Sequence, residues 1–215
     1  MNTNEEKMLQ ILKELKDNYN VFSVKAEFEA EGTRTDDLLR LCDLVRRSGL
    51  SLTIKIGGCE AIRDLIECKQ LGVDRIVAPM IETDYSLEKF IGAIDYVYSD
   101  EDINDTSFYM NLETITAFNN LKDISEVLKN SPVNGYVFGR ADFCGSLGLG
   151  KDDINNNEVL EYALKVSQNC LDNDFEFVVG GGVSFDSAEF FKSLILADIW
   201  TSFFSKVSIT SIVPS

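Results

Sequence analysis

The stretch "SLTIKIGGCEAIRDLIECKQLGVDRIVAPMIE" (residues 51–82) decides the fold, because it reads as a strand, a helix and a second strand. An apolar and β-branched run opens it and ends at two glycines. Apolar side chains then recur at helical spacing, and Gly72 suits the end of that helix. The second apolar run covers residues 74–82. Two strands joined through a helix run parallel by a right-handed crossover, so this stretch predicts a βαβ unit.

The same alternation continues in both directions along the chain. Further strands are expected at 21–29, 106–114, 134–143, 175–183 and 197–204, and helices at 3–18, 35–49, 86–98, 121–130, 157–171 and 187–196. Seven strands favour an α/β fold with a (β/α)8 TIM-type barrel, and an open doubly wound sheet is the alternative. The last segment, "KVSITSIVPS", could supply an eighth strand, but no helix precedes it. We therefore expect a barrel that is incomplete, irregularly closed at its C-terminus or completed by a partner chain.

Length and composition predict one globular domain over residues 1–215, with an amphipathic helix at 1–19 and a barrel at 20–215. Apolar residues make up 45% of the chain and charged residues 26%, and no apolar run approaches the roughly 18 residues that span a bilayer. The acidic N-terminus resembles neither a signal nor a transit peptide, which predicts a cytoplasmic location. The opening helix must bury a stripe formed by Met8, Ile11, Leu12 and Leu15.

Charge and residue usage exclude several classes of function. The net charge of −16 opposes binding to nucleic acid and to anionic membranes, although a small anionic substrate responds to its local site. Histidine is absent, which removes the usual general base, the usual zinc ligand and every Ser-His or Cys-His triad. The five cysteines form no CxxC pair, so we expect free thiols that mostly pack in the core.

Function in a parallel barrel gathers where the strands end, and two acidic residues stand there on successive strands. Glu113 ends the run 106–114, and Asp142 ends the run 134–143. Adjacent carboxylates repel each other unless a cation lies between them, and Mg²⁺ or Mn²⁺ prefers such oxygen ligands. The glycine-studded stretch "CGSLGLG" (144–150) would let backbone amides approach a bound anion. The alternative is structural, with Glu113 capping a helix and Asp142 capping a turn.

Three segments carry a resemblance to a known family. The segments "IVAPMIET", "MNLETITAFNNL" and "VFGRADFCGSLGL" are similar, in order and spacing, to signatures of the HpcH/HpaI aldolase and citrate lyase β-subunit superfamily. The resemblance covers roughly residues 21–190. It implies a Mg²⁺-dependent barrel of the phosphoenolpyruvate/pyruvate group, with Glu113 and Asp142 as the metal ligands. It also implies a homo-oligomer.

Two departures from the family pattern stand near the first two strands. Aldolases of the family carry an Asp-x-Glu-His segment at the first strand, and Ala30 occupies the place of that histidine. Lys55 stands where the family has an arginine that holds the substrate. Members of the citrate-lyase type also lack the histidine, but they bind a thioester carrier, and the sequence shows no clear basic patch for one.

These residues predict a carbon–carbon lyase that acts on an oxo-acid or hydroxy-acid through a metal-stabilised enolate. Lys55 and Arg140 are the groups expected to meet the charge on the enolate, and Gly57 and Gly139 are expected to line the substrate site with them. A metal-bound hydroxide, Glu27 or Glu29 is the candidate base, and we select Glu29.

Two other functions fit the same sequence. Lys55 could form a Schiff base without a metal. A catalytically degenerate barrel would instead bind a metabolite or a partner. The residues are compatible with a free acid and with a thioester as the substrate, and they do not select one compound.

Overall fold

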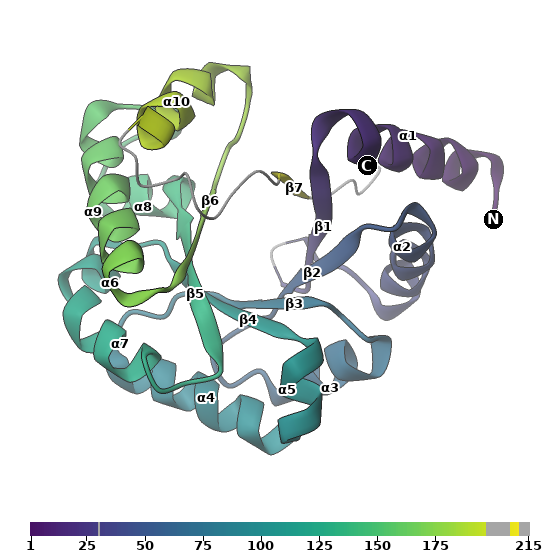
Figure 1. Cartoon of the computed structure of the whole chain (residues 1–215), viewed down its shortest axis with the longest axis horizontal. Helices are drawn as coiled ribbons and strands as arrows, with labels where there is room; N and C mark the ends of the chain where they lie inside the picture. Colours follow the sequence, from purple (N-terminus) through teal and green to yellow (C-terminus); the bar gives the residue numbers. More distant parts are fainter. Residues whose placement is uncertain (30, 197–206, 211–215) are drawn as a thin grey trace.

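The structure is a computed structural model that describes residues 1–29, 31–196 and 207–210 (Figure 1). Its centre is one parallel sheet in the order β6-β5-β4-β3-β2-β1-β7. The strands are β1 (Val21–Glu27), β2 (Ser51–Lys55), β3 (Arg75–Ala78), β4 (Ser107–Leu112), β5 (Val133–Gly139), β6 (Glu176–Gly180) and β7 (Val207–Thr210). Consecutive strands from β1 to β6 are neighbours, as repeated βα units require.

Helices cover the outer side of the curved sheet (Figure 1). They are α1 (Thr3–Tyr19), α2 (Thr35–Ser48), α3 (Ile62–Leu71), α4 (Asp84–Val97), α5 (Asp100–Asp105), α6 (Ile115–Asn119), α7 (Leu121–Leu128), α8 (Arg140–Ser146), α9 (Asn157–Asn173) and α10 (Ala188–Leu196). Two 3₁₀ turns, η1 (Lys151–Asp153) and η2 (Phe185–Ser187), lie between them. None of the described helices has the length and apolarity that crossing a membrane requires.

The barrel is open over the described residues, so they form a TIM-type barrel that is not a full (β/α)8 ring. Strands β6 and β7 are the two edges of the sheet and form no ladder with each other. The strand expected at 197–204 lies outside the described residues, so the structure does not test it. The last segment does supply a strand, since β7 pairs with β1 in parallel. Incomplete closure is therefore confirmed for the part of the chain that the structure describes.

The two faces of the sheet differ in chemistry. Side chains that face the helices are apolar and buried: Val24, Ala26, Leu52, Ile54, Ile76, Phe108, Met110, Leu112, Tyr136, Phe138 and Phe177. Side chains that alternate with them on the inner face are largely polar. Ser23 and Thr53 share a hydrogen bond of 2.6 Å, and the Tyr109 hydroxyl donates to Glu176 at 2.7 Å. Burial and the charge of Glu176 raise the pKa of Tyr109 to about 12, so its hydroxyl keeps its proton at neutral pH.

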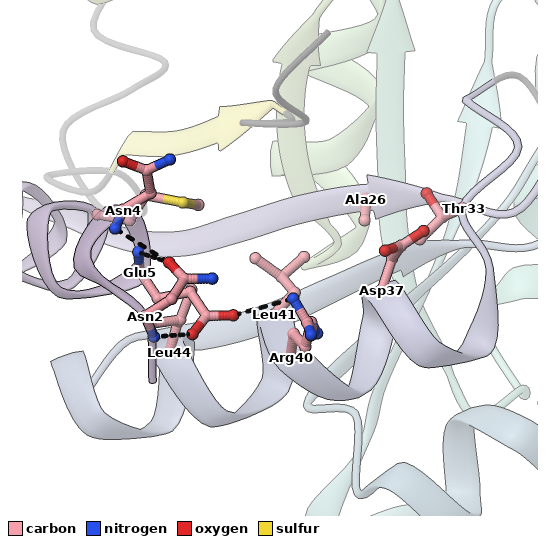
Figure 2. A pocket seen from close by; sticks show the side chains of 10 residues that line it. Asn2, Asn4, Glu5, Ala26, Thr33, Asp37, Arg40, Leu41 and Leu44 are labelled. Carbon is pink, nitrogen blue, oxygen red and sulfur yellow. Dashed lines mark hydrogen bonds and ion pairs between the residues drawn. The ribbon is translucent and has the colours of Figure 1, made fainter.

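The N-terminal helix packs against its neighbour in the outer layer. The side chain of Asn2 caps α1 in a reciprocal capping box with Glu5, and α1 lies beside α2 and β1. A cavity of about 360 Å³ lies at this junction, and the Arg40 guanidinium donates to the Glu5 carboxylate there at 3.3 Å. Figure 2 shows the side chains that line it. Leu12 is buried as expected, but Ile11 is exposed and does not belong to the buried stripe.

The other core expectations are mostly confirmed. Cys42, Cys68, Cys144 and Cys170 are buried free thiols, while Cys59 is half-buried. Phe138, Phe143, Phe175 and Phe177 also lie in the core. Phe185, by contrast, is 93% exposed at the start of η2, after β6.

Two glycines should respond to alanine in opposite directions. A Cβ at Gly135 would overlap the backbone carbonyl of Glu176 on the neighbouring strand, and backbone cannot move aside. We expect Gly135→Ala to lower the free energy of unfolding by about 1–3 kcal/mol or more. Gly92 lies inside α4 with no atom within 4 Å of the same position. We expect Gly92→Ala to raise stability by about 0.5–1 kcal/mol.

Denaturant unfolding of both variants measures the difference. A neutral effect of alanine at residue 135 would contradict the close approach of β5 and β6.

Candidate functional site

A buried carboxylate lies at the end of β4. Glu113 directly follows that strand and is 2% exposed. Its carboxylate accepts hydrogen bonds from the Met80 backbone N–H at 3.0 Å and from Asn111 Nδ2 at 2.7 Å. The backbone of Met80 adopts a left-handed conformation with φ of 50°, which a residue with a side chain adopts only at a cost. The chain thus tolerates local strain at the residue whose N–H binds Glu113.

The neighbouring strand leaves room for this carboxylate. A Cβ on Gly139, the last residue of β5, would come within 2.9 Å of both Cβ and Oε2 of Glu113. Any larger residue at 139 would therefore displace the acid. Gly139, which we expected to line the substrate site, instead makes space for Glu113.

Asp142 lies three residues after Gly139, on a helix rather than on a strand. Strand β5 ends at Gly139, and α8 begins at Arg140, so the expectation that a strand runs to 143 is wrong. The stretch after Asp142 is also helical up to Ser146, which corrects the expectation of a flexible loop at 144–146. Asp142 is exposed and lies in the first turn of α8, a position that favours acidic residues.

Electrostatics connect the two acids. Burial raises the pKa of the Glu113 carboxyl, the Asp142 charge raises it further, and the Lys55 charge and the two hydrogen bonds oppose the rise. The net shift is upward. A group of three or more Cys, Asp or Glu side chains placed to hold a metal does not occur among the described residues. Any ion at this point would therefore rely on these two carboxylates, with substrate or water as further ligands.

Lysine and glutamate side chains alternate at the ends of β1 and β2. Glu27 and Lys55 are register partners, and the Lys55 Nζ lies 3.4 Å from Glu27 Oε2. Lys25 donates to the other oxygen, Oε1, at 2.6 Å. Burial of the Glu27 carboxyl raises its pKa, but the hydrogen bond from Lys25 and the charges of both lysines outweigh burial and hold the pKa below its ordinary value. Glu27 is therefore an ionised counter-ion for two cations.

A cavity of about 180 Å³ opens beside these side chains. Glu27, Glu29, Lys55, Gly57 and Met80 line it, together with Ile56 and Pro79. A Cβ on Gly57 would come within 2.8 Å of Glu29 Cγ, so Gly57 makes room for Glu29. The Glu29 side chain makes no hydrogen bond or ion pair with the residues that the structure describes. Lys55, Glu29 and Gly57, which the sequence analysis named separately, thus line one opening.

Arg140 is buried away from the cavity that Lys55 lines. Its side chain is 0% exposed and donates to the Gly180 carbonyl at 3.1 Å, the Gly181 carbonyl at 2.8 Å and Asn155 Oδ1 at 2.7 Å. The rings of Phe190 and Phe191 lie 4.8 and 5.1 Å from its guanidinium carbon. These contacts tie α8 to the glycine turn after β6 and to α10, and they leave no face of Arg140 at the cavity that Lys55 lines.

Sequence reasoning missed three residues of this region. Asn111 lies two residues before Glu113 on the same face of β4, and its buried Oδ1 accepts no hydrogen bond from the described residues. Lys25 bears the same relation to Glu27 on β1. Strand alternation from each acid could have identified both. The left-handed backbone of Met80 has no signal in the sequence.

The Glu27 contacts predict how stability depends on pH. A carboxyl whose folded pKa is depressed stabilises the fold above its ordinary pKa of 4.5, and this contribution is lost as the pH falls through the lower folded value. We expect Glu27→Gln to lower the melting temperature at pH 7, with a difference from the unsubstituted protein that shrinks below pH 4.5. Melting curves across this range measure the difference.

Glu126→Gln is the matched control for this prediction. Glu126 also pairs with a lysine, Lys129, at 2.7 Å, but on the surface of α7. Exposed pairs contribute little, so its effect should be small at every pH. A deficit in Glu27→Gln that stays constant with pH would contradict the role of Glu27 as an ionised counter-ion.

Comparisons with known proteins address the fold and the ancestry of the chain. The family model described as HpcH/HpaI aldolase/citrate lyase matches residues 35–179. The solved HpcH/HpaI aldolase from Desulfitobacterium hafniense DCB-2 is 12% identical, with a TM-score of 0.73 over 99% of this chain and 84% of that chain. An HpcH/HpaI aldolase/citrate lyase family protein from Burkholderia cenocepacia J2315 gives a TM-score of 0.72 at 11% identity, over 96% and 84%.

A third solved structure, the citrate synthase SbnG, is 13% identical, with a TM-score of 0.69 over 95% of this chain and 82% of that chain. No curated protein sequence matches the chain. At these identities the three structures establish a shared fold and nothing about substrate.

Proposed function

The chain belongs to the HpcH/HpaI aldolase/citrate lyase family, and on that premise we propose that it cleaves a carbon–carbon bond of an oxo-acid or hydroxy-acid through a metal-stabilised enolate. Family membership indicates a lyase of the aldolase or citrate lyase type. The metal, the substrate class and the residue roles are the proposal. The observation that carries it is the buried Glu113 carboxylate, which lies within the electrostatic influence of both Lys55 and Asp142 at the ends of the strands.

Glu113 and Asp142 fit a divalent cation of the Mg²⁺ or Mn²⁺ type. A buried carboxylate whose pKa is raised by burial and by a second carboxylate is stabilised by a nearby cation. Gly139 keeps the space beside Glu113 clear of side chains, and the unpaired Oδ1 of Asn111 is a further buried oxygen next to it. When bound, the ion would act as a Lewis acid on a substrate carbonyl.

Lys55 is the cation proposed to meet the charge that develops on the substrate. It lines the cavity, and its charge already acts on Glu113. A positive group in place before reaction stabilises a developing enolate without reorganisation. The cavity of about 180 Å³ suits a small acid. Arg140 is proposed as a positioning residue that holds the start of α8, and hence Asp142, against the Gly180–Gly182 turn.

Glu29 is proposed as the general base. It lines the cavity with Lys55, and its carboxylate makes no hydrogen bond or ion pair with the described residues. Glu27 is less suited, because both of its oxygens contact lysines and its lowered pKa makes it a weaker base. Lys55 is also poorly suited to a Schiff base, since its Nζ is already engaged in an ion pair with Glu27 at 3.4 Å. We further propose a homo-oligomer, as the family resemblance implies.

Exchange of the methyl protons of pyruvate for deuterium tests the proposal, because enolisation is one half of the reaction and requires no second substrate. We expect the protein to catalyse this exchange in D₂O with Mg²⁺ or Mn²⁺, as followed by proton NMR. Glu113→Gln and Asp142→Asn should each reduce the rate by at least about 10²-fold, since each removes a proposed ligand of the ion that would polarise the substrate carbonyl. Glu29→Gln should also reduce it, by roughly 10²-fold or more.

Glu126→Gln is the control, because it removes a surface carboxylate and should leave the rate unchanged. Exchange that persists in EDTA, with borohydride trapping pyruvate on Lys55, would replace the proposal with a Schiff-base mechanism. Absence of exchange in the unsubstituted protein with either metal would favour a barrel that only binds a metabolite or a partner.

A further inference from the structure

Lys25 is a cation on the inner face of the barrel to which the proposed reaction assigns no role. It lies on β1 two residues before Glu27, so both side chains project from the same face of the strand. The side chains of Lys25, Glu27 and Lys55 are only 19%, 12% and 17% exposed. Desolvating a lysine in this way is costly, and it persists only where the charge is paired.

The two lysines compete for one carboxylate. Glu27 Oε1 accepts a hydrogen bond from Lys25 at 2.6 Å, whereas Oε2 lies 3.4 Å from Lys55. The short contact is a strong charge-assisted hydrogen bond, and the long one is a weaker ion pair. Lys55 is therefore not fully committed to Glu27, and its charge reaches Glu113 on the other side. Without Lys25, Glu27 would have Lys55 as its one close cationic partner and would draw it closer.

Other groups near Glu27 do not replace Lys25. The backbone N–H of Glu27 donates to Glu31 Oε2 at 3.2 Å, and Glu29 is a further carboxylate at the same opening. Both are acidic and cannot satisfy Glu27. Among the described residues, Lys25 and Lys55 are the cations in contact with this carboxylate. The arrangement thus depends on the balance between these two lysines.

We propose that Lys25 is a positioning residue that binds Glu27 and thereby leaves Lys55 directed toward the substrate, an inference that rests on the lyase function proposed above. The role of Lys25 is to occupy Glu27 so that Lys55 keeps its distance from that carboxylate. Lys25 does not line the cavity, and its contact is with Glu27 rather than with the proposed metal ligands.

Five variants test this inference in the pyruvate exchange assay. Lys25→Met removes the charge and the donor, and Lys25→Arg keeps both. Lys129→Met is the matched control, because Lys129 makes an equally short contact with Glu126 on the protein surface. Glu27→Gln, alone and combined with Lys25→Met, completes a double-mutant cycle that asks whether Lys25 acts through Glu27.

We expect Lys25→Met to lower kcat by about tenfold to a hundredfold with a smaller change in KM, because a misplaced Lys55 fails mainly in the transition state. Lys25→Arg should recover most of the rate, and Lys129→Met should match the unsubstituted protein. In the Glu27→Gln background, Lys25→Met should have no further effect. Loss of activity that Lys25→Arg does not rescue, or that persists in full when residue 27 is Gln, would overturn the inference.

A second readout does not depend on catalysis. The Lys55 Cε resonance, in protein labelled with ¹³C at lysine Cε and assigned with Lys55→Met, should move in Lys25→Met and stay in place in Lys129→Met. An unmoved resonance would overturn the positioning role even if the protein proved to be a lyase. If the resonance moves but the unsubstituted protein catalyses no exchange, the contact network stands, while the proposed function and the catalytic part of this inference fail.

Discussion

The site is organised around the burial of one carboxylate, Glu113, at the end of β4. Burial of an acid is unfavourable unless hydrogen bonds and cations stabilise its charge. The surrounding residues are arranged accordingly. The backbone N–H of Met80 and the amide of Asn111 donate to the carboxylate, Gly139 makes room for it, and Lys55 supplies positive charge. Asp142 acts in the opposite direction, and the proposed cation would compensate for its charge.

The inner face of the barrel extends the same principle. Lys25, Glu27 and Lys55 form a line of alternating charges on β1 and β2, and Lys55 connects that line to Glu113. Each of these charged side chains lies near a side chain of opposite charge, which stabilises the charges although the side chains are partly buried. One change in it therefore alters the charge available at the candidate metal site. One departure from the family resemblance falls in the same region, where Lys55 stands in place of an arginine, while the other, Ala30, lies outside the described residues.

The fold could be predicted from the sequence to the extent that it depends on local pattern. Residues 51–82 form β2, α3 and β3 in the expected order, and the closing strand at 207–210 lies beside β1. The ends of the elements were less predictable. Arg140 and Asp142 follow an apolar run that ends in glycine, and nothing local reveals that a helix begins there. The burial of Arg140 also depends on carbonyls about 40 residues away in the chain.

The contacts of the site residues likewise differ in how far the sequence could predict them. The approach of Glu113 and Asp142 could be inferred because neighbouring strands end together. The pairing of Lys25 with Glu27 follows from strand alternation on β1. The contact between Lys55 and Glu27 depends on the register of β1 and β2, which no local pattern fixes.

Manganese binding tests the central claim most directly, because Mn²⁺ bound to protein loses the sharp electron paramagnetic resonance signal of the free ion. Titration should reveal one site per chain that is lost in both Glu113→Gln and Asp142→Asn and retained in Glu126→Gln. Equal binding in all four proteins would show that Mn²⁺ binds elsewhere on this acidic chain. That result would contradict the claim that Glu113 is buried in order to hold a cation.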